Sequence, residues 1–583
     1  MTGVVLLVLL AAMAAAAPAN SGDQPAPADL VLLGGKVVTL DPQRPRATAL
    51  AARAGRIAAV GEPAAMRRLI GPATRVIALD GQLVLPGFIE AHGHFLALGR
   101  ALQQLDLRPA RTFAAIVGQV RRAAATAAPG DWIVGRGWHQ DKWRRPPALQ
   151  REGLPLGAPL DAVAPANPVM LVHASGHALL ANARALAAAG IASDTPDPPG
   201  GRIVRDADGR PTGALRENAT DAVRAAWQRW RADRSPARRR ADRRRTVAAA
   251  TRECLRHGVT SFQDAGSSLA EVAFFEALAA SGRLHIRLWL MLDEEDAVLA
   301  PALERVRQVG SGDQRLTVRA IKRYADGALG SHGARLLQPY ADRPQQTGLE
   351  VTPVAALRRS AELALAHDFQ LCTHAIGDRA NREVLDVYRQ VLGEAGAERR
   401  WRIEHAQHLH PRDIPRFGRL GVIASMQAVH CISDGPWVTE RLGRERVQRG
   451  GYAWRALLQS GARLVNGSDT PVEPVDPIAG FHALVTRRLA DGSTVPGAQT
   501  IGREQALRAM TCDAAWAAFE EDVKGSLSPG KLADWVVLSQ DLLAVPAERI
   551  GDTRVLLTVL GGRVVHEARA GRAAEQADDS GVP

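Results

Sequence analysis

Short apolar runs alternate with longer helical stretches along the body of the chain, a pattern typical of a parallel sheet wound with helices. Eight of these runs are predicted to be strands, at residues 83–89, 259–264, 285–292, 317–324, 370–374, 402–405, 422–427 and 463–469. Eight parallel strands, each followed by a helix, close into a (β/α)8 barrel. The expected fold class is therefore α/β, with this barrel over residues 86–523.

Both ends of the chain depart from this alternation. Each end holds short β segments separated by turn residues, without helices of barrel length between them. Residues 24–85 and 524–570 are therefore predicted to form one composite β-sandwich domain. A second departure is the long gap between the first two barrel strands. It predicts an insertion at about residues 100–225, with strands of its own at 132–138 and 168–173.

The first residues have the pattern of an export signal. Residues 4–17 are one apolar run, and Ala17-Pro18-Ala19 offers a cleavage site between small residues. Residues 1–19 are therefore predicted to be a signal peptide, and the mature protein to be periplasmic or secreted without stable membrane insertion. A retained N-terminal membrane anchor is the alternative. The four cysteines (Cys254, Cys372, Cys431 and Cys512) form no CxxC pair, and the sequence leaves their disulfide state open.

The chain is basic, with 73 Lys and Arg against 61 Asp and Glu and a net charge of +12. The Arg-rich stretch 238–245 could contact the phosphates of a nucleic acid. It fits the solvated face of a helix over 224–256 better, because no nucleic-acid-binding motif accompanies it. The expected partner is therefore a small-molecule substrate and not a nucleic acid. A homodimer is left open.

Residues able to bind a metal lie at the carboxyl ends of the predicted strands. They are Glu90, His92 and His94 at the first strand, Lys322 and Asp326 at the fourth, His374 at the fifth, His405 at the sixth and Asp469 at the eighth. In a (β/α)8 barrel these ends meet on one face, where active sites are built. Imidazole and carboxylate ligands suit Zn²⁺ and similar ions, so the series predicts a transition-metal site.

Several motifs carry a family resemblance over about residues 29–567. The stretch Pro86-Gly-Phe-Ile-Glu-Ala-His-Gly-His94 resembles the first metal motif of the amidohydrolase superfamily. Thr373-His-Ala-Ile-Gly-Asp378, Ile403-Glu-His-Ala-Gln407 and Gly467-Ser-Asp-Thr-Pro-Val472 extend the likeness. The chain is most similar to amidohydrolase family 3, in the branch of N-substituted formamide deformylases. This resemblance implies a metal-dependent hydrolase barrel.

The resemblance also implies roles for single residues. His92 and His94 would bind a first metal, and His374 and His405 a second. Asp469 would bind the first metal and act catalytically, accepting the proton of the attacking water. The metal would be a divalent ion, best Zn²⁺, with one or two per chain.

Lys322 falls where some superfamily members carry a carboxylated lysine that bridges two metals. Only five of the 73 basic residues are lysines, so a lysine at the barrel mouth stands out. A guanidinium cannot become a carbamate, which favours a bridging role for Lys322. The alternative is an ion pair between Lys322 and Asp326.

Other polar residues have weaker signals. His177 is a candidate for substrate binding from the insertion, as are Arg216 and Glu217, with a structural role in the insertion as the alternative. Glu404 is expected to point away from the barrel interior, because neighbouring strand residues face opposite sides. Asp378 is expected to support a ligand or cap a helix, and Cys372 to pack. His408, His410 and His430 are read as loop histidines, and Trp138, Trp143 and Trp437 as pocket or lid residues.

These features predict the hydrolysis of an amide, N-substituted formamide or related non-peptide C–N bond. A deaminase or a cyclic-amide hydrolase on the same scaffold is the alternative enzyme. A non-catalytic binding protein that keeps the fold is the alternative of another class. The complete set of ligand residues argues against this alternative, because a protein that no longer catalyses a reaction needs none of them.

Overall fold

The computed structural model describes residues 26–140, 143–145, 147, 149–174 and 178–568. The predicted signal peptide and His177 lie outside these residues. Within the described part, no helix is long and apolar enough to cross a bilayer. All four cysteines are free thiols.

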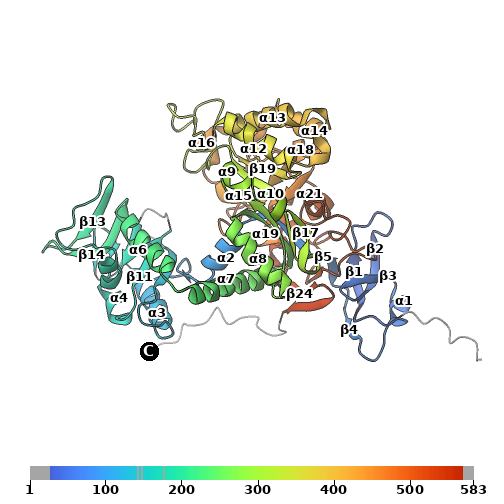
Figure 1. Ribbon diagram of the computed structural model, residues 1–583, viewed down its shortest axis with the longest axis horizontal. Coiled ribbons are helices and arrows are strands. Elements are labelled where there is room, and N and C mark those ends of the chain that lie inside the picture. The colour runs from blue at the N-terminus through green and yellow to red at the C-terminus, as the bar shows by residue number, and fades with distance from the viewer. Residues whose placement is uncertain (1–25, 141–142, 146, 148, 175–177, 569–583) are drawn as a thin grey trace, which may run out of the picture.

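Eight parallel strands form the barrel that the sequence predicts. Their order around the sheet is the order in the chain: β6 (Phe88–Gly93), β15 (Val259–Ser267), β16 (Arg287–Leu292), β18 (Leu316–Tyr324), β19 (Gln370–Ala375), β20 (Arg402–His405), β21 (Ile423–Met426) and β22 (Leu464–Asn466). The helices between successive strands include α7 (Pro236–Arg256), α8 (Leu269–Ala280), α12 (Val354–Ala366), α13 (Asp378–Leu392), α14 (Ile414–Leu420) and α18 (Trp454–Gln459). Helices α19 (Pro477–Thr486), α20 (Arg503–Ala509) and α21 (Cys512–Ala517) follow β22. The strands and helices bury one large apolar core between them (Figure 1).

The predicted first barrel strand, 83–89, is wrong in its bounds, because the run is divided at Gly87. Residues Leu83–Pro86 form β5, which belongs to another sheet, and the barrel strand β6 begins only at Phe88. A Cβ on Gly87 would lie 2.3 Å from Oγ1 of Thr260, so only glycine lets the chain pass this close to β15. The apolar pattern continues through the break, which hides it from the sequence.

Strands from both ends of the chain meet in one eight-stranded sheet. Its order is β25-β24-β23-β5-β1-β2-β3, with β4 paired to β1. The strands are β1 (Leu30–Val38), β2 (Arg46–Arg53), β3 (Arg56–Gly61), β4 (Arg75–Ala78), β23 (Trp535–Leu538), β24 (Val555–Leu560) and β25 (Arg563–Glu567). A buried ion pair ties this sheet to the barrel: Nε and Nη2 of Arg287 on β16 lie 2.6 and 2.8 Å from the two carboxylate oxygens of Asp534.

The insertion forms a separate lobe, on the left in Figure 1, to which α2 (Phe95–Ala101) and α7 lead from the barrel. Its six-stranded sheet has the order β13-β14-β12-β11-β8-β7, in which β7 is Leu105–Asp106, β12 Ala178–Ala181, β13 Gly201–Arg205 and β14 Pro211–Glu217. The predicted strands at 132–138 and 168–173 are β8 (Ile133–Trp138) and β11 (Val169–His173). Trp138 and Trp143 stack with ring centroids 5.9 Å apart inside the core of this lobe, so they pack there.

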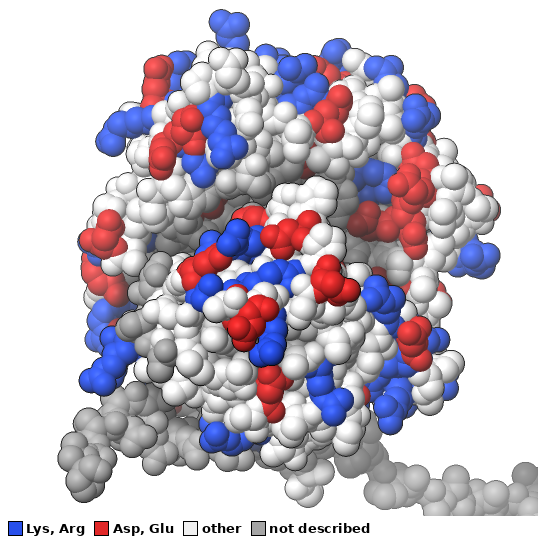
Figure 2. Space-filling model, turned by 90° about the vertical axis from the view of Figure 1, so that its left-hand side faces the viewer, with Lys and Arg blue, Asp and Glu red and all other residues white. Residues whose placement is uncertain are grey.

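The basic stretch of the sequence lies on α7. The helix expected over 224–256 is two helices, α6 (Thr220–Ala232) and α7, because Ser235 caps α7 and Pro236 begins it. Within the stretch, Asp242 forms ion pairs with Arg234 and Arg245. Figure 2 faces the insertion lobe and shows Lys and Arg interspersed with Asp and Glu, with a hollow above the lobe.

Candidate metal centre

The predicted ligands come from five strand ends on one face of the barrel. His92 lies on β6 and His94 directly after it, while Lys322, His374 and His405 lie on β18, β19 and β20. Asp469 follows β22 by three residues. The structure thus places all six predicted residues at the carboxyl ends of the strands, as barrel geometry requires.

The first and last strands are joined at the site by hydrogen bonds. The Glu90 carboxylate accepts the backbone N–H (2.7 Å) and the hydroxyl (2.8 Å) of Ser468, and the backbone N–H of Asp469 donates to the carbonyl of His92 (2.7 Å). A Cβ on Gly467 would lie 2.5 Å from both Oε1 of Glu90 and the backbone nitrogen of His92. Glycine at 467 therefore allows the contact that brings Asp469 beside His92.

The side chains of this face converge. His92, His405 and Asp469 each offer one ligand atom, and these atoms lie within 4.8 Å of one another. Oδ1 of Asp469 lies 3.2 Å from Nε2 of His94 and 3.6 Å from Nε2 of His92. His374 is adjacent, since its ring centroid is 4.4 Å from that of His405. This is the size of cluster that one or two metal ions would occupy.

Three atoms of the cluster fit a cation. Nε2 of His92, Nε2 of His374 and Oδ1 of Asp469 are buried and make no hydrogen bond within the described chain. Buried polar atoms of this kind usually have a partner, because leaving one unpaired costs about 1–3 kcal/mol. A metal ion bound by these lone pairs would remove that cost, and the donor set of imidazoles and a carboxylate is one that Zn²⁺ accepts.

The electrostatics of the site keep His92, His374 and His405 neutral, which is the form that binds metals. Burial, followed by the charge of Lys322, lowers the pKa of His92 to about 4 and that of His374 to about 3. Burial and the neighbouring His374 hold the pKa of His405 well below its ordinary value. Burial would raise the pKa of Asp469, but His94 and His92 hold it below its usual range, so the carboxylate is ionised at neutral pH.

Glu404 faces the site, and the expectation that it points away from the interior is wrong. Its Oε2 lies 2.5 Å from Nδ1 of His92, and the side chain is buried. Alternation places Glu404 on the same face of β20 as Arg402, inside the barrel. His405 has φ 74°, in the left-handed region, so strict alternation ends there. Glu404 and His405 can therefore both serve the centre.

Arg402 holds Glu404 in place from inside the barrel. Its Nε and Nη2 lie 2.7 and 3.0 Å from the two carboxylate oxygens, and Nη2 also donates to Oγ of Ser425 (2.7 Å). Burial would raise the pKa of Glu404, but Arg402 and His92 hold it well below its ordinary value. An ionised Glu404 accepts a hydrogen bond from the N–H at Nδ1 of His92. The lone pair of Nε2 is then free to bind a metal.

Lys322 is buried among these groups and does not pair with Asp326. Its Nζ lies 4.9 Å from the centre of the Tyr324 ring. The oxygens of Asp326 instead accept the backbone N–H groups of Ile376 (2.9 Å), Gly377 (2.8 Å) and Arg335 (2.8 Å). Burial lowers the pKa of Lys322, and the charges of Glu404 and Asp469 oppose this shift.

His430 is a site residue that the sequence pattern missed. It lies on α15 (Ala428–Asp434), and its buried Nε2 is 3.9 Å from Oδ2 of Asp469. The amide of Gln407 donates to Nδ1 of His430 (3.0 Å). Neither residue stands at a strand end of the regular pattern.

Three weaker candidates remain. Asp378 accepts the backbone N–H of Leu337 (2.8 Å) at the start of α13, and Cys372, the register partner of Lys322 in the barrel, packs in an apolar cluster with Trp289. Arg216 donates to the carbonyl of Glu152 within the insertion lobe. These contacts are structural.

The barrel and its site define a metal-dependent hydrolase. The amidohydrolase family model matches residues 75–566, and the chain belongs to this family. It is 35% identical to Protein LONG AFTER FAR-RED 3 of Arabidopsis thaliana, with 92% of each chain covered. It is 27% identical to the N-substituted formamide deformylase of Arthrobacter pascens, over 92% of this chain and 98% of the other. An uncharacterized metal-dependent hydrolase from Pyrococcus furiosus has a similar structure, with a TM-score of 0.71 and 26% identity over 88% of this chain and 99% of that one.

Glu404→Gln should weaken metal binding by about 10- to 100-fold, because the amide no longer fixes the proton of His92 on Nδ1. Metal affinity measured by competition with a chelating dye checks this. The matched control is Glu521→Gln, which removes a carboxylate from Arg400 (2.7 Å) away from the histidines and should leave affinity unchanged. Equal affinity of Glu404→Gln and the wild-type protein would contradict the role of Glu404.

Proposed function

We propose that the protein hydrolyses a non-peptide C–N bond, in an amide or an N-substituted formamide. The observation that carries this proposal is the convergence of buried ligand atoms of His92, His405 and Asp469, which lie within 4.8 Å of one another. The relative whose name is N-substituted formamide deformylase supports the choice of bond.

The residues present suit one or two divalent cations, best Zn²⁺. His92, His94 and Asp469 would hold one, and His374 and His405 the other, with Lys322 between them. When bound, the metal supplies Lewis acidity, which polarises a carbonyl group and lowers the pKa of water from 15.7 towards about 7. The protein supplies the ligand geometry and the proton transfers.

Asp469 is placed to move the proton. Its ionised carboxylate is buried beside His92 and His94, and it would take a proton from the attacking water while the oxygen of that water bonds to the carbonyl carbon. The C–N bond then breaks, and Asp469 returns the proton to the nitrogen of the leaving amine. Such a transfer contributes roughly 10²–10⁴ in rate.

His430 is placed to donate a hydrogen bond to the carbonyl oxygen. Because Gln407 donates to Nδ1, the proton of the neutral ring lies on Nε2. That nitrogen therefore cannot bind a metal, and it faces the Asp469 carboxylate without a hydrogen-bond partner in the described chain. A donor of this kind stabilises the negative charge that develops on the carbonyl oxygen.

A panel of formamides, N-acyl amines, hydantoins and lactams tests the proposal. We expect turnover of a formamide or N-acyl amine, loss of that turnover with dipicolinate, and its return with Zn²⁺. Metal analysis after mild purification should give at least about one transition metal per chain. Less metal than this, or a turnover rate that dipicolinate does not change, would count against the proposal. Turnover of hydantoins alone would replace it by cyclic-amide hydrolysis.

Lys322 decides whether the centre holds two metals. A carbamate on its amine would be an anion able to bridge two cations, whereas an ammonium would repel them. Lys322→Ala and Lys322→Arg should both lower metal content and activity, and a short carboxylic acid should partly rescue Lys322→Ala. Lys36→Arg, on the surface, is the control. Two metals and near-normal turnover in Lys322→Arg would rule out the bridge.

His430→Ala should reduce kcat by about 10²–10³, the loss found when one oxyanion donor is removed. Its metal content should not change, because the ring is not a ligand in this proposal. Steady-state kinetics and metal analysis on the same preparation check both. A variant that loses its metal together with its activity would instead make His430 a ligand.

A further inference from the structure

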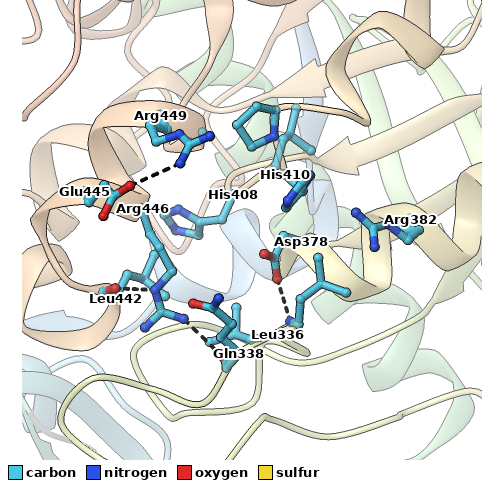
Figure 3. Close-up of a pocket in the computed structure, with 14 residues that line it drawn as sticks. Leu336, Gln338, Asp378, Arg382, His408, His410, Leu442, Glu445, Arg446 and Arg449 are labelled. Atoms are coloured by element: carbon cyan, nitrogen blue, oxygen red, sulfur yellow. Dashed lines mark hydrogen bonds and ion pairs between the residues drawn. The ribbon is translucent and has the colours of Figure 1, made fainter.

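A cavity of about 440 Å³, separate from the metal centre, lies beside the loop that follows β20 (Figure 3). Its walls are the start of α13, residues 336–338, residues 408–411, and the segment from Leu442 through α17 (Arg444–Gly450). None of the proposed metal ligands lines it. The volume is within the range of small-molecule sites.

His408 offers this cavity two unpaired ring nitrogens. The residue is 4% exposed, and neither Nδ1 nor Nε2 has a hydrogen-bond partner among the residues that the structure describes. Its position is fixed, because its backbone N–H donates to the carbonyl of Ile376 (3.0 Å) and its ring packs against Tyr452 at 5.2 Å. Figure 3 shows the ring in the middle of the cavity residues.

Arg446 offers the cavity an unneutralised charge. Two other arginines of the lining have carboxylate partners: Arg382 pairs with Asp413 (2.9 Å) and Arg449 with Glu445 (3.1 Å). Arg446 donates only to the carbonyls of Leu442 and Gln338, and no ion pair within the described residues neutralises it.

Two of the three guanidinium groups of the lining are neutralised by ion pairs, Arg382 by Asp413 outside the lining and Arg449 by Glu445. Arg446 and the Asp378 carboxylate are the charged groups of the lining that remain. Burial, and then the neighbouring Arg446, lower the pKa of His408 to about 3. The ring is therefore neutral at pH 7, with one nitrogen that donates and one that accepts.

We propose that this cavity is a second ligand site, which binds a small organic anion. Arg446 and the N–H of His408 would bind a carboxylate or phosphate group, since charge-assisted bonds to guanidinium are the stronger kind. The other nitrogen of His408 would accept a hydrogen bond from a hydroxyl or amine on the same molecule. The site is independent of the proposed C–N hydrolysis.

Calorimetric titration of the full chain with malate, succinate and inorganic phosphate tests this. We expect malate to bind with a Kd between about 10 µM and a few mM, and more tightly than succinate, which lacks the hydroxyl. Arg446→Gln should weaken binding at least about tenfold, as loss of a charge-assisted bond predicts. Arg444→Gln is the matched control, because Arg444 is exposed on the same helix and does not line the cavity. Tighter binding of phosphate than of malate would assign the site to phosphate compounds.

Two further variants separate this site from the metal centre. His408→Phe keeps an aromatic ring and removes both nitrogens, so it should weaken malate binding as Arg446→Gln does. Thermal melting checks that this variant folds. If it does not fold, the binding of malate to Arg446→Gln decides the test. Asp469→Asn should bind malate like the wild-type protein. The proposal is overturned if none of the three probes binds at about 20 mM. It is equally overturned if binding survives Arg446→Gln or is lost in Asp469→Asn.

Discussion

Closure of the barrel between its first and last strands is the contact on which the site depends. Glu90 and Ser468 are 378 residues apart in the chain, yet their hydrogen bonds set the distance between His92 and Asp469. The backbone bond from Asp469 to His92 adds to this, and Gly467 leaves the room for it. A barrel that failed to close would still have its helices and most of its strands. It would lack the pairing of a histidine with the carboxylate that its chemistry requires.

The site combines neutral histidines with a buried ion pair between Glu404 and Arg402. His92, His374 and His405 are neutral because burial disfavours their protonated form, while Glu404 is ionised because Arg402 compensates its burial. A buried carboxylate of this kind would be costly alone, and the guanidinium makes it tolerable. The barrel interior therefore supplies a fixed negative charge behind His92. That charge would strengthen the ring as a ligand of the proposed metal.

Much of this arrangement follows from the sequence, because strand periodicity and barrel geometry together place His92, His374, His405 and Asp469 on one face. The sequence fails where the backbone leaves its regular path. Glu404 lies on the interior face with Arg402, and the left-handed φ of His405 lets the next side chain reach the same centre, which no pattern of apolar residues signals. Gly87 divides an unbroken apolar run between two sheets. The contacts of His430 and the lining of the cavity near His408 arise from loops and short helices, which periodicity cannot fold.

The sheet built from both ends of the chain has a consequence for biosynthesis. About 450 residues separate β5 from β23, its antiparallel neighbour. At roughly 5–20 residues per second, a ribosome needs about 20–90 s to cover that distance. During this time the edge of β5 that β23 later covers is open, and open edges are templates for wrong pairing. The nascent chain must therefore be protected at its N-terminal strands until translation is almost complete, which makes late truncations far more damaging than their length suggests.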